Sequence, residues 1–429
     1  MTRLNSTMGM LLLGLAGLLS ACGAGGSPEG SLQITLSAPG GVTPRVLVLG
    51  PNNFRQTLSA STTLSPLAAG NYYLLPQSVR RTGGTTTDTA FSADPQTVAV
   101  NGSASANVSY AQAPGSGKLW TGLSFINEGT PLLLGFDAGD LASSSTALSA
   151  SARLGQDASV DSPQDIAFDA GGNLWVASFR QNRLVQYSVS QLGSRDPALR
   201  PLRVLSSPDL DGPWGLAFDG EGGLWVSGGG KVVYFSAHTL AAATNSLRAD
   251  RTLRGFSSPA GLAFDSTGNL WVADSATSRS QVLGFAPSKI AGSGSPTPDF
   301  SLTGGSATSP IAPQGLAFDA SGNLWVSTIG WLFRYPKARL GNTAAQPDIQ
   351  LQTDTPSFLF GAMAFDNGGN LWVTDFNGSQ NLILMYAPAA QRPGLGQQVR
   401  PTRSFSGPDL SRAPYGLAFN LAPSGLPLR

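Results

Sequence analysis

One short motif recurs six times along this chain. It begins with Gly, Asp or Ala, continues with Leu, Ile or Met and then Ala-Phe, and ends in Asp or Asn. The copies are Asp165–Asp169, Gly215–Asp219, Gly261–Asp265, Gly315–Asp319, Ala362–Asp366 and Gly416–Asn420. Five of them are followed by Leu-Trp-Val, at Leu174–Val176, Leu224–Val226, Leu270–Val272, Leu324–Val326 and Leu371–Val373. The phenylalanines of successive copies are 50, 46, 54, 47 and 54 residues apart, which indicates a repeated supersecondary unit.

The sixth Leu-Trp pair predicts how the repeats close. Leu119-Trp120-Thr121 precedes the first copy, whereas the last copy, Gly416–Asn420, has no such pair after it. A period near 50 residues with short apolar strands and glycine-rich turns is typical of a β-propeller. We therefore predict a six-bladed propeller over residues 118–429. Its N- and C-terminal strands pair in one blade, so that no sheet edge stays open.

Each repeat is expected to supply four strands in a fixed order. The Ala-Phe-Asp strand lies innermost, the Leu-Trp-Val strand comes second, and a variable strand lies outermost. The third strands end in an aromatic residue, at Tyr187, Phe235, Phe285, Tyr335 and Tyr386.

The N-terminal segment resembles a bacterial lipoprotein signal. Arg3 precedes an apolar run from Met8 to Leu19 that is short for a membrane span. The run ends in Leu19-Ser20-Ala21-Cys22, which resembles a lipobox, and Cys22 is the only cysteine of the chain. The resemblance implies removal of residues 1–21, lipidation of Cys22, and anchoring to a membrane of the bacterial cell envelope on its extracytoplasmic side. With Cys22 used in this way, a disulfide or a cysteine-based metal site is excluded.

A small β-sandwich is expected before the propeller. Residues 22–30 are rich in Gly and Ser and predict a lipidated flexible tether, and residues 113–117 predict a linker. Between them, residues 31–112 alternate apolar and polar side chains in five segments bounded by turn residues: 32–36, 45–49, 71–75, 97–100 and 104–110. The stretch from Leu64 to Leu74 resembles Ig-like modules of the carboxypeptidase-regulatory type, which implies a stalk or spacer. The whole chain is thus expected to be all-β.

Charge excludes one class of partner. Arg3 is the only charged residue before Cys22, so the rest of the chain has 25 basic and 25 acidic residues. A balanced chain with 12% charged residues lacks the basic surface that nucleic-acid binding needs.

The repeat itself resembles a known family. The pattern Pro-x-Gly-Leu-Ala-Phe-Asp-x-x-Gly-Asn-Leu-Trp-Val-Ala-Asp, with a later Val-x-x-Phe, resembles NHL-repeat propellers. More broadly it resembles the gluconolactonase and streptogramin-lyase superfamily. The resemblance implies the propeller architecture rather than one activity, because this scaffold carries many functions.

The most regular residues of the repeat are expected to be structural. The six repeated tryptophans (Trp120, Trp175, Trp225, Trp271, Trp325 and Trp372) should pack between blades. The motif aspartates should accept hydrogen bonds from the backbone amides of the turns that follow them.

Residues that break the repeat are the candidates for function. Loops that lead into the inner strands and loops that leave the second strands should meet at one mouth of the central channel. There the sequence places amides and aromatic side chains suited to a carbohydrate, peptide or envelope-protein ligand: Gln164, Trp214, Gln314, Trp331, Tyr415, Phe179 and Arg180. The first interpretation is therefore a monomeric, membrane-anchored binding protein without a definite cofactor.

The alternative is a hydrolase of the gluconolactonase type. Such an enzyme holds a divalent metal such as calcium with oxygen ligands, and Asp274 and Asp375 are the candidates, with Asn127, Glu128 and Asn377 nearby. The lyases of the superfamily depend on several histidines. This chain has only His238, at an outer position, which argues against that chemistry.

Overall fold

The computed structural model describes residues 29–81, 90–114, 116–124, 133–276, 280–303, 312–341, 345–352, 360–376, 381–392 and 394–420. Regular structure in these ranges is strand, apart from one short α-helix, α1 (Ala237–Ala242), and the 3-10 turns η1 (Val189–Gly193), η2 (Pro287–Lys289), η3 (Lys337–Arg339), η4 (Pro388–Ala390) and η5 (Pro408–Leu410). The all-β prediction is confirmed. None of the described helices is long and apolar enough to cross a membrane. Cys22 lies outside the described residues.

Two sheets near the N-terminal end pack their apolar faces together. One has the order β4 (Thr62–Ala68), β1 (Glu29–Ser37), β9 (Ser103–Ser109); the other has the order β3 (Arg55–Leu58), β2 (Val46–Leu49), β5 (Gly70–Pro76), β8 (Gln96–Val100). Alternate residues of β1 are buried, so Leu32 and Ile34 share one core with Val48 and Leu74 of the facing sheet. Five of these strands, β1, β2, β5, β8 and β9, coincide with the five alternating segments of the sequence. A small sheet, β10 (Ala111–Gln112), β7 (Ala90–Ser92), β6 (Val79–Arg80), follows toward the rest of the molecule.

The described part of the chain from Leu119 onward forms six further sheets. From the inside outward, the first three are β14 (Pro163–Phe168), β15 (Leu174–Ser178), β16 (Arg183–Tyr187), β17 (Arg203–Ser206); β18 (Leu216–Phe218), β19 (Leu224–Gly228), β20 (Lys231–Phe235), β21 (Arg251–Arg254); and β22 (Pro259–Phe264), β23 (Leu270–Asp274), β24 (Gln281–Phe285), β25 (Phe300–Thr303). The others are β26 (Leu316–Phe318), β27 (Leu324–Ser327), β28 (Leu332–Tyr335), β29 (Ile349–Gln352), β33 (Gly394–Gln398); β30 (Phe360–Phe365), β31 (Leu371–Phe376), β32 (Asn381–Tyr386), β34 (Arg403–Phe405); and β35 (Pro414–Phe419), β11 (Leu119–Leu123), β12 (Leu133–Phe136), β13 (Ala152–Leu154).

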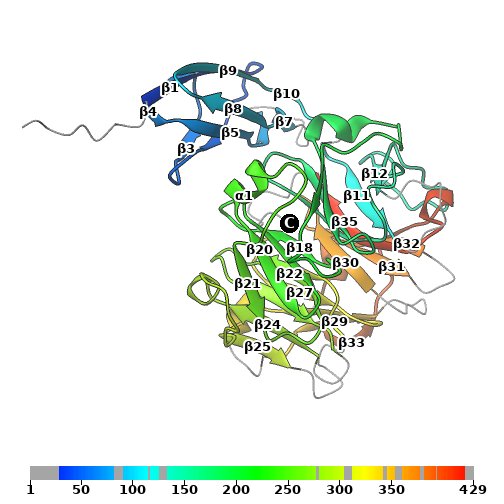
Figure 1. Ribbon diagram of the computed structural model, residues 1–429. Coiled ribbons are helices and arrows are strands. Elements are labelled where there is room, and N and C mark those ends of the chain that lie inside the picture. The colour runs from blue at the N-terminus through cyan, green and yellow to red at the C-terminus, as the bar shows by residue number, and fades with distance from the viewer. Residues whose placement is uncertain are drawn as a thin grey trace, which may run out of the picture.

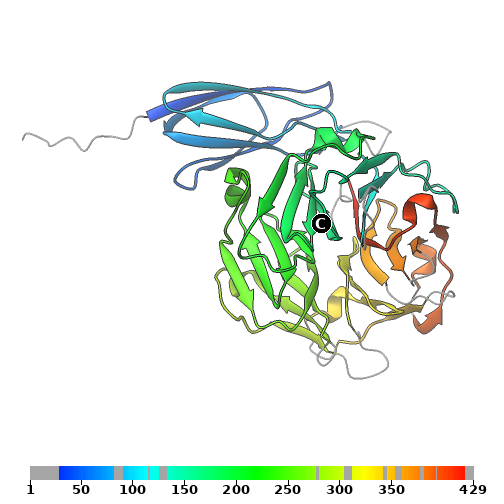
Figure 2. The same cartoon turned by 45° about the vertical axis from the view of Figure 1, so that its right-hand side comes forward.

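These sheets stand around a common axis (Figures 1 and 2). Their innermost strands contact one another in the order β14, β18, β22, β26, β30, β35, and β35 contacts β14 again. The last sheet joins the two ends of this region: Leu119 pairs with Phe419, and Thr121 pairs with Leu417. In Figure 1, cyan β11 accordingly lies beside red β35. One strand differs from the predicted arrangement of four strands per sheet. β33 pairs in parallel with β29 and adds a fifth strand to that sheet.

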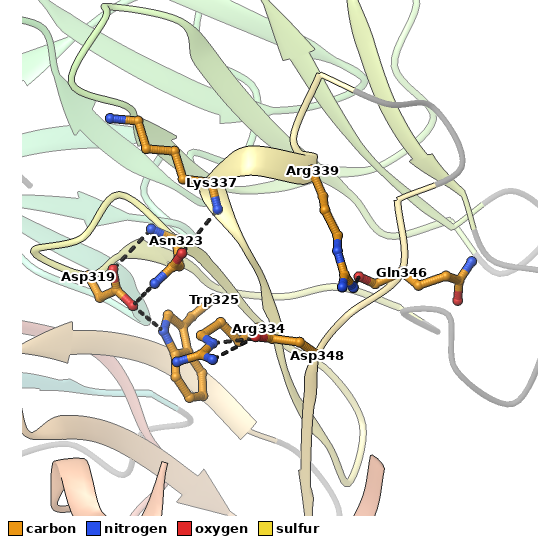
Figure 3. A network of polar contacts seen from close by, with 8 residues as sticks. All are labelled: Asp319, Asn323, Trp325, Arg334, Lys337, Arg339, Gln346 and Asp348. Atoms are coloured by element: carbon orange, nitrogen blue, oxygen red, sulfur yellow. Dashed lines mark hydrogen bonds and ion pairs between the residues drawn. The ribbon is translucent and has the colours of Figure 1, made fainter. Parts of the chain in front are cut away.

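The motif aspartate ties each turn to the tryptophan that follows it. Figure 3 shows this for one sheet: Asp319 accepts from Asn323, whose amide lies 2.9 Å from Oδ1, and Oδ2 accepts from Trp325 Nε1 at 3.1 Å. The Ser321 amide also donates to Asp319 Oδ1, at 3.0 Å. The same bond to the indole nitrogen recurs from Trp175, Trp225, Trp271 and Trp372 to their own motif aspartates. The turn-capping role predicted for the aspartates is observed. A neutral Asn420 stands in the last copy, where Trp120 Nε1 is buried without a hydrogen-bond partner.

Each of these indoles also packs against the next sheet. Trp175 meets Phe218 at 6.0 Å between ring centroids, and Trp225 meets Phe264 at 6.1 Å, both edge to face. The pattern continues around the ring through Trp271–Phe318, Trp325–Phe365 and Trp372–Phe419. Both repeated aromatic residues thus serve sheet-to-sheet packing, as predicted for the tryptophans.

The N-terminal sheets lie against one end of this ring (Figures 1 and 2), where turns join the innermost strands to the second strands. The hydroxyls of Ser78 and Ser92 both donate to the Gly171 carbonyl, each at 2.8 Å. Apolar side chains of β2 and β5 share a cluster with Ala237 of α1, and Tyr73 meets the His238 ring at 5.4 Å. The single histidine therefore packs at this contact, away from the channel mouth.

Candidate functional site

Close backbone approach around the axis determines the width of the channel. A Cβ at Gly215 would lie 2.3 Å from the Ala260 carbonyl oxygen, and one at Gly261 would lie 2.4 Å from that of Gln314. Glycine is therefore required at these two positions, where one inner strand faces the next. The first copy has Asp165 at this place. Its carboxylate accepts from the Ile166 amide at 2.9 Å and, across to the next sheet, from the Leu216 amide at 3.0 Å.

A small cavity of about 20 Å³ lies at one mouth of the channel. Its lining includes four of the predicted residues, Gln164, Trp214, Gln314 and Tyr415, together with Asp165, Phe376, Ala362 and the glycines at 215, 261, 315 and 361. The loops that lead into different inner strands thus converge, as the repeat predicts. A space of this size holds about one water molecule, so a larger ligand has to bind on the mouth rather than inside it.

Four aromatic side chains, here called the aromatic row, cross this mouth: Phe179, Trp214, Tyr415 and Phe376. Phe179 meets Trp214 edge to face at 5.7 Å, Trp214 meets Tyr415 at 6.3 Å, and Tyr415 meets Phe376 at 4.5 Å. All four are half-buried. Burial raises the pKa of the Tyr415 hydroxyl to about 12, so this side chain is neutral at physiological pH.

Gln164 supplies a polar group beside the row. Its Nε2 donates to the hydroxyls of Ser124 and Ser162, at 3.2 and 3.1 Å. The side chain is 6% exposed, and its Oε1 has no hydrogen-bond partner in the structure.

Three of the seven predicted residues are not among those that line the cavity; of these, Phe179 contacts the lining residue Trp214 in the aromatic row. Trp331, on the loop between β27 and β28, packs against the apolar cluster between the β22 and β26 sheets instead of lining the mouth. Arg180 is exposed and is not among the lining residues. Conversely, Asp165 and Phe376 line the mouth but are not among the predicted ligand-binding residues. Asp165 could have been found, because it replaces glycine in the repeat.

The carboxylates considered for a metal are held in their own sheets. Asp274 is fully buried and accepts from the amides of Ser257 and Ser258 at 2.6 to 3.1 Å. Asp375, also buried, lies opposite Phe360 in a different sheet. Among the described residues there is no cluster of three or more His, Cys, Asp or Glu side chains that could hold a metal ion. The neighbouring candidates Asn127, Glu128 and Asn377 lie outside the described residues.

The NHL repeat family matches residues 256–285, which span β22 to β24. The chain contains a β-propeller. The sheet order, the ring of inner strands and this repeat agree on that fold. No curated protein matches the chain.

Several solved structures are similar at low identity. They include a putative 6-phosphogluconolactonase from Bacteroides uniformis (16% identity, TM-score 0.46, covering 66% of this chain and 82% of that one) and virginiamycin B lyase from Staphylococcus aureus (12%, 0.38, 68% and 90%). Hydrazine synthase from Kuenenia stuttgartiensis is also similar (12%, 0.39, 53% and 63%), and this chain spans less than two thirds of its length.

Proposed function

We propose that this protein is an extracytoplasmic, membrane-anchored lipoprotein that uses the channel mouth of a six-bladed propeller to bind a carbohydrate or peptide. In this proposal, lipidated Cys22 anchors the chain, an Ig-like module of residues 31–112 spaces the propeller from the membrane, and the protein acts as a monomer. The aromatic row is the observation that carries the binding role.

The aromatic row offers a rigid apolar surface at low conformational cost. Aromatic side chains dominate many recognition surfaces because they bury a large area with few rotatable bonds. Here the ring contacts hold all four side chains in place before a ligand arrives. The sugar face of a glycan or an apolar peptide side chain is suited to such a surface.

The size of the mouth favours recognition of a surface-bound ligand. Pockets that enclose small molecules have volumes of about 300 to 1,000 Å³, whereas this cavity has about 20 Å³. Gln164 and Gln314 lie beside the row and supply amide groups for specificity. The mouth thus combines an apolar platform with a few polar groups, as binding sites commonly do.

Binding of defined ligands to the soluble chain from Glu29 onward tests the proposal. Isothermal titration with peptidoglycan fragments, other glycans and peptides should find a ligand class that binds without added metal. Trp214→Ala should weaken that binding by about 30-fold or more, because anchoring aromatic residues contribute about 2 kcal/mol or more. Leu202→Ala is the control, because Leu202 is an exposed apolar residue just before the outer strand β17, and it should leave affinity unchanged.

Two results would contradict the proposal. The first is binding that is unaffected by Trp214→Ala and Tyr415→Ala. The second is turnover of a lactone that requires calcium and stops with EDTA, which would favour the gluconolactonase-type hydrolase instead.

A further inference from the structure

One charged side chain belongs to the described lining of the cavity at the channel mouth. It is Asp165, and the corresponding residue of the other five copies of the motif is Gly or Ala. The residue is 5% exposed, and its carboxylate accepts from the Ile166 and Leu216 amides, which are neutral donors. A carboxylate at a site that excludes bulk water attracts a cation more strongly than one at the open surface. The lining thus favours a ligand with a positive charge.

The described loops around the mouth are acidic as well. The loops that lead into the inner strands or leave the second strands hold five described aspartates and two described arginines: Asp157, Asp161, Asp209, Asp211, Asp409, Arg180 and Arg412. One aspartate is neutralised, because Asp409 forms an ion pair with Arg153 at 2.6 Å. Neither arginine is among the residues that line the cavity. Four aspartates therefore remain against two arginines, and their field also favours a cation.

The size of the cavity limits which cation can enter it. The volume is about 20 Å³, which is the space of about one water molecule. The ammonium head of a lysine side chain is a compact point charge of about that size, whereas the guanidinium of arginine is a larger planar group. A primary ammonium therefore fits this space and a guanidinium does not.

The aromatic row provides a surface for the rest of such a side chain. All four of its members are partly exposed, and Trp214, Tyr415 and Phe376 also line the cavity. A lysine packs its four-carbon stem along apolar surface, and its ammonium is attracted to aromatic ring faces within about 6 Å. The ring centroids are 6.3 Å apart between Trp214 and Tyr415 and 4.5 Å apart between Tyr415 and Phe376. One ammonium can thus lie within reach of two rings.

We propose that the mouth binds a peptide through one lysine side chain. The ammonium enters the cavity that Asp165 lines, and the four-carbon stem lies against Trp214 and Tyr415. This inference rests on the binding function proposed above, and it narrows the ligand to a lysine-bearing peptide rather than a carbohydrate.

Three peptides of the form acetyl-Gly-X-Gly-amide test the inference, with lysine, norleucine or arginine as X. They are titrated by NMR into the soluble chain from Glu29 onward at low ionic strength. The lysine peptide should bind at one site and about tenfold more tightly than the norleucine peptide, which has the same stem without the charge. The arginine peptide should bind no more tightly than the norleucine peptide. Added salt should weaken binding of the lysine peptide and leave that of the norleucine peptide unchanged.

Substitutions then locate the site. Asp165→Gly gives the first copy of the motif the glycine of its neighbours, so the fold should persist. It should reduce the preference for lysine over norleucine to about twofold or less, because the charge in the lining is gone. Trp214→Leu should weaken binding of both peptides by about fivefold or more. Asp140→Gly makes the same change at an exposed site between β12 and β13 and should bind both peptides as the wild type does.

The outcomes separate this inference from the proposed function. Equal affinity for the lysine and norleucine peptides, lost in Trp214→Leu, would overturn the inference and leave a binding mouth. So would a glycan that binds in a Trp214-dependent way while no peptide binds at about 10 mM. A lysine preference that survives Asp165→Gly, or an arginine peptide that binds as tightly as the lysine peptide, would also overturn it. If Trp214→Leu changes no binding at all, the proposed function itself is wrong.

Discussion

Asp169 and Asp265 hold the same place in two copies of the repeat, yet their pKa values shift in opposite directions. Burial raises the pKa of Asp265, but hydrogen bonds from Thr267, Asn269 and Trp271 together outweigh it, and the net shift is downward. For Asp169, burial outweighs the same kind of bonds, and its pKa is raised. The difference follows from position, because the N-terminal sheets cover the turn that follows Asp169 and contact it at Gly171.

Asp265→Asn should lower the free energy of unfolding by about 1 to 3 kcal/mol at pH 7, because a buried donor then faces an amide N–H₂ group. A lowered pKa means that the contribution of the carboxylate is complete above its unfolded value of about 3.9 and is lost as pH falls through the folded value. The difference in free energy of unfolding between the wild type and Asp265→Asn should therefore be smaller at pH 3 than at pH 7. Urea unfolding at pH 7 and at pH 3 measures this difference. A difference that is larger at pH 3 than at pH 7 would contradict the prediction.

Asp169→Asn should show the opposite trend. A raised pKa means that the contribution of Asp169 to stability is complete below about pH 3.9 and is lost as pH rises through the folded value. The gap between wild type and this variant should therefore be larger near pH 3 than at pH 7. The same urea experiment serves, with Asp265→Asn as the matched comparison. If the differences in free energy of unfolding for Asp169→Asn and Asp265→Asn change with pH in the same direction, the two aspartates do not have different environments.

The role of such residues could be predicted from sequence only where the repeat determines it. The spacing of Asp319 and Trp325 gave their packing and capping roles, because every copy builds the same local turn. Gln186 and Trp331 vary between copies, and what they contact depends on side chains distant in sequence. Trp331 therefore packs on an apolar cluster that the loop sequence does not reveal, and Gln186 donates to Asp169, a contact that the variable position does not predict.

At the scale of the strand, the close approach of inner strands predicts a strong effect of a single methyl group. Gly261→Ala would place a Cβ 2.4 Å from the Gln314 carbonyl oxygen, so the β22 and β26 strands must move apart. We expect a loss of about 2 kcal/mol or more in the free energy of unfolding. Gly292→Ala is the matched control, since a Cβ there meets nothing within 4 Å, and it should change stability by less than about 0.5 kcal/mol. Comparable unfolding curves for the two variants would refute the close approach.

Strand order within a sheet was predictable because the apolar pattern repeats, and the pairing of β11 with β35 was predictable because one Leu-Trp pair was out of place. The parallel pairing of β33 with β29 was not. It joins a segment after β32 to a different sheet, so no local pattern marks it. For the same reason the position of α1 against β5 could not be read from either segment alone.

At the scale of the whole molecule, the contact between the N-terminal sheets and the propeller decides whether the chain unfolds as one unit. The Gly171 carbonyl accepts hydroxyls from both Ser78 and Ser92, at 2.8 Å each, and an apolar cluster lies beside them. Two hydrogen bonds at a partly buried contact contribute about 1 to 3 kcal/mol together.

Calorimetry of the soluble chain should therefore give one unfolding transition for the wild type. In the double variant Ser78→Ala, Ser92→Ala, the N-terminal sheets should lose the support of the propeller and unfold in a separate, earlier transition. Ser105→Ala removes an exposed hydroxyl of β9 and should keep the single transition of the wild type. Two transitions in the wild type itself, at temperatures that the double variant leaves unchanged, would mean that the contact carries no coupling.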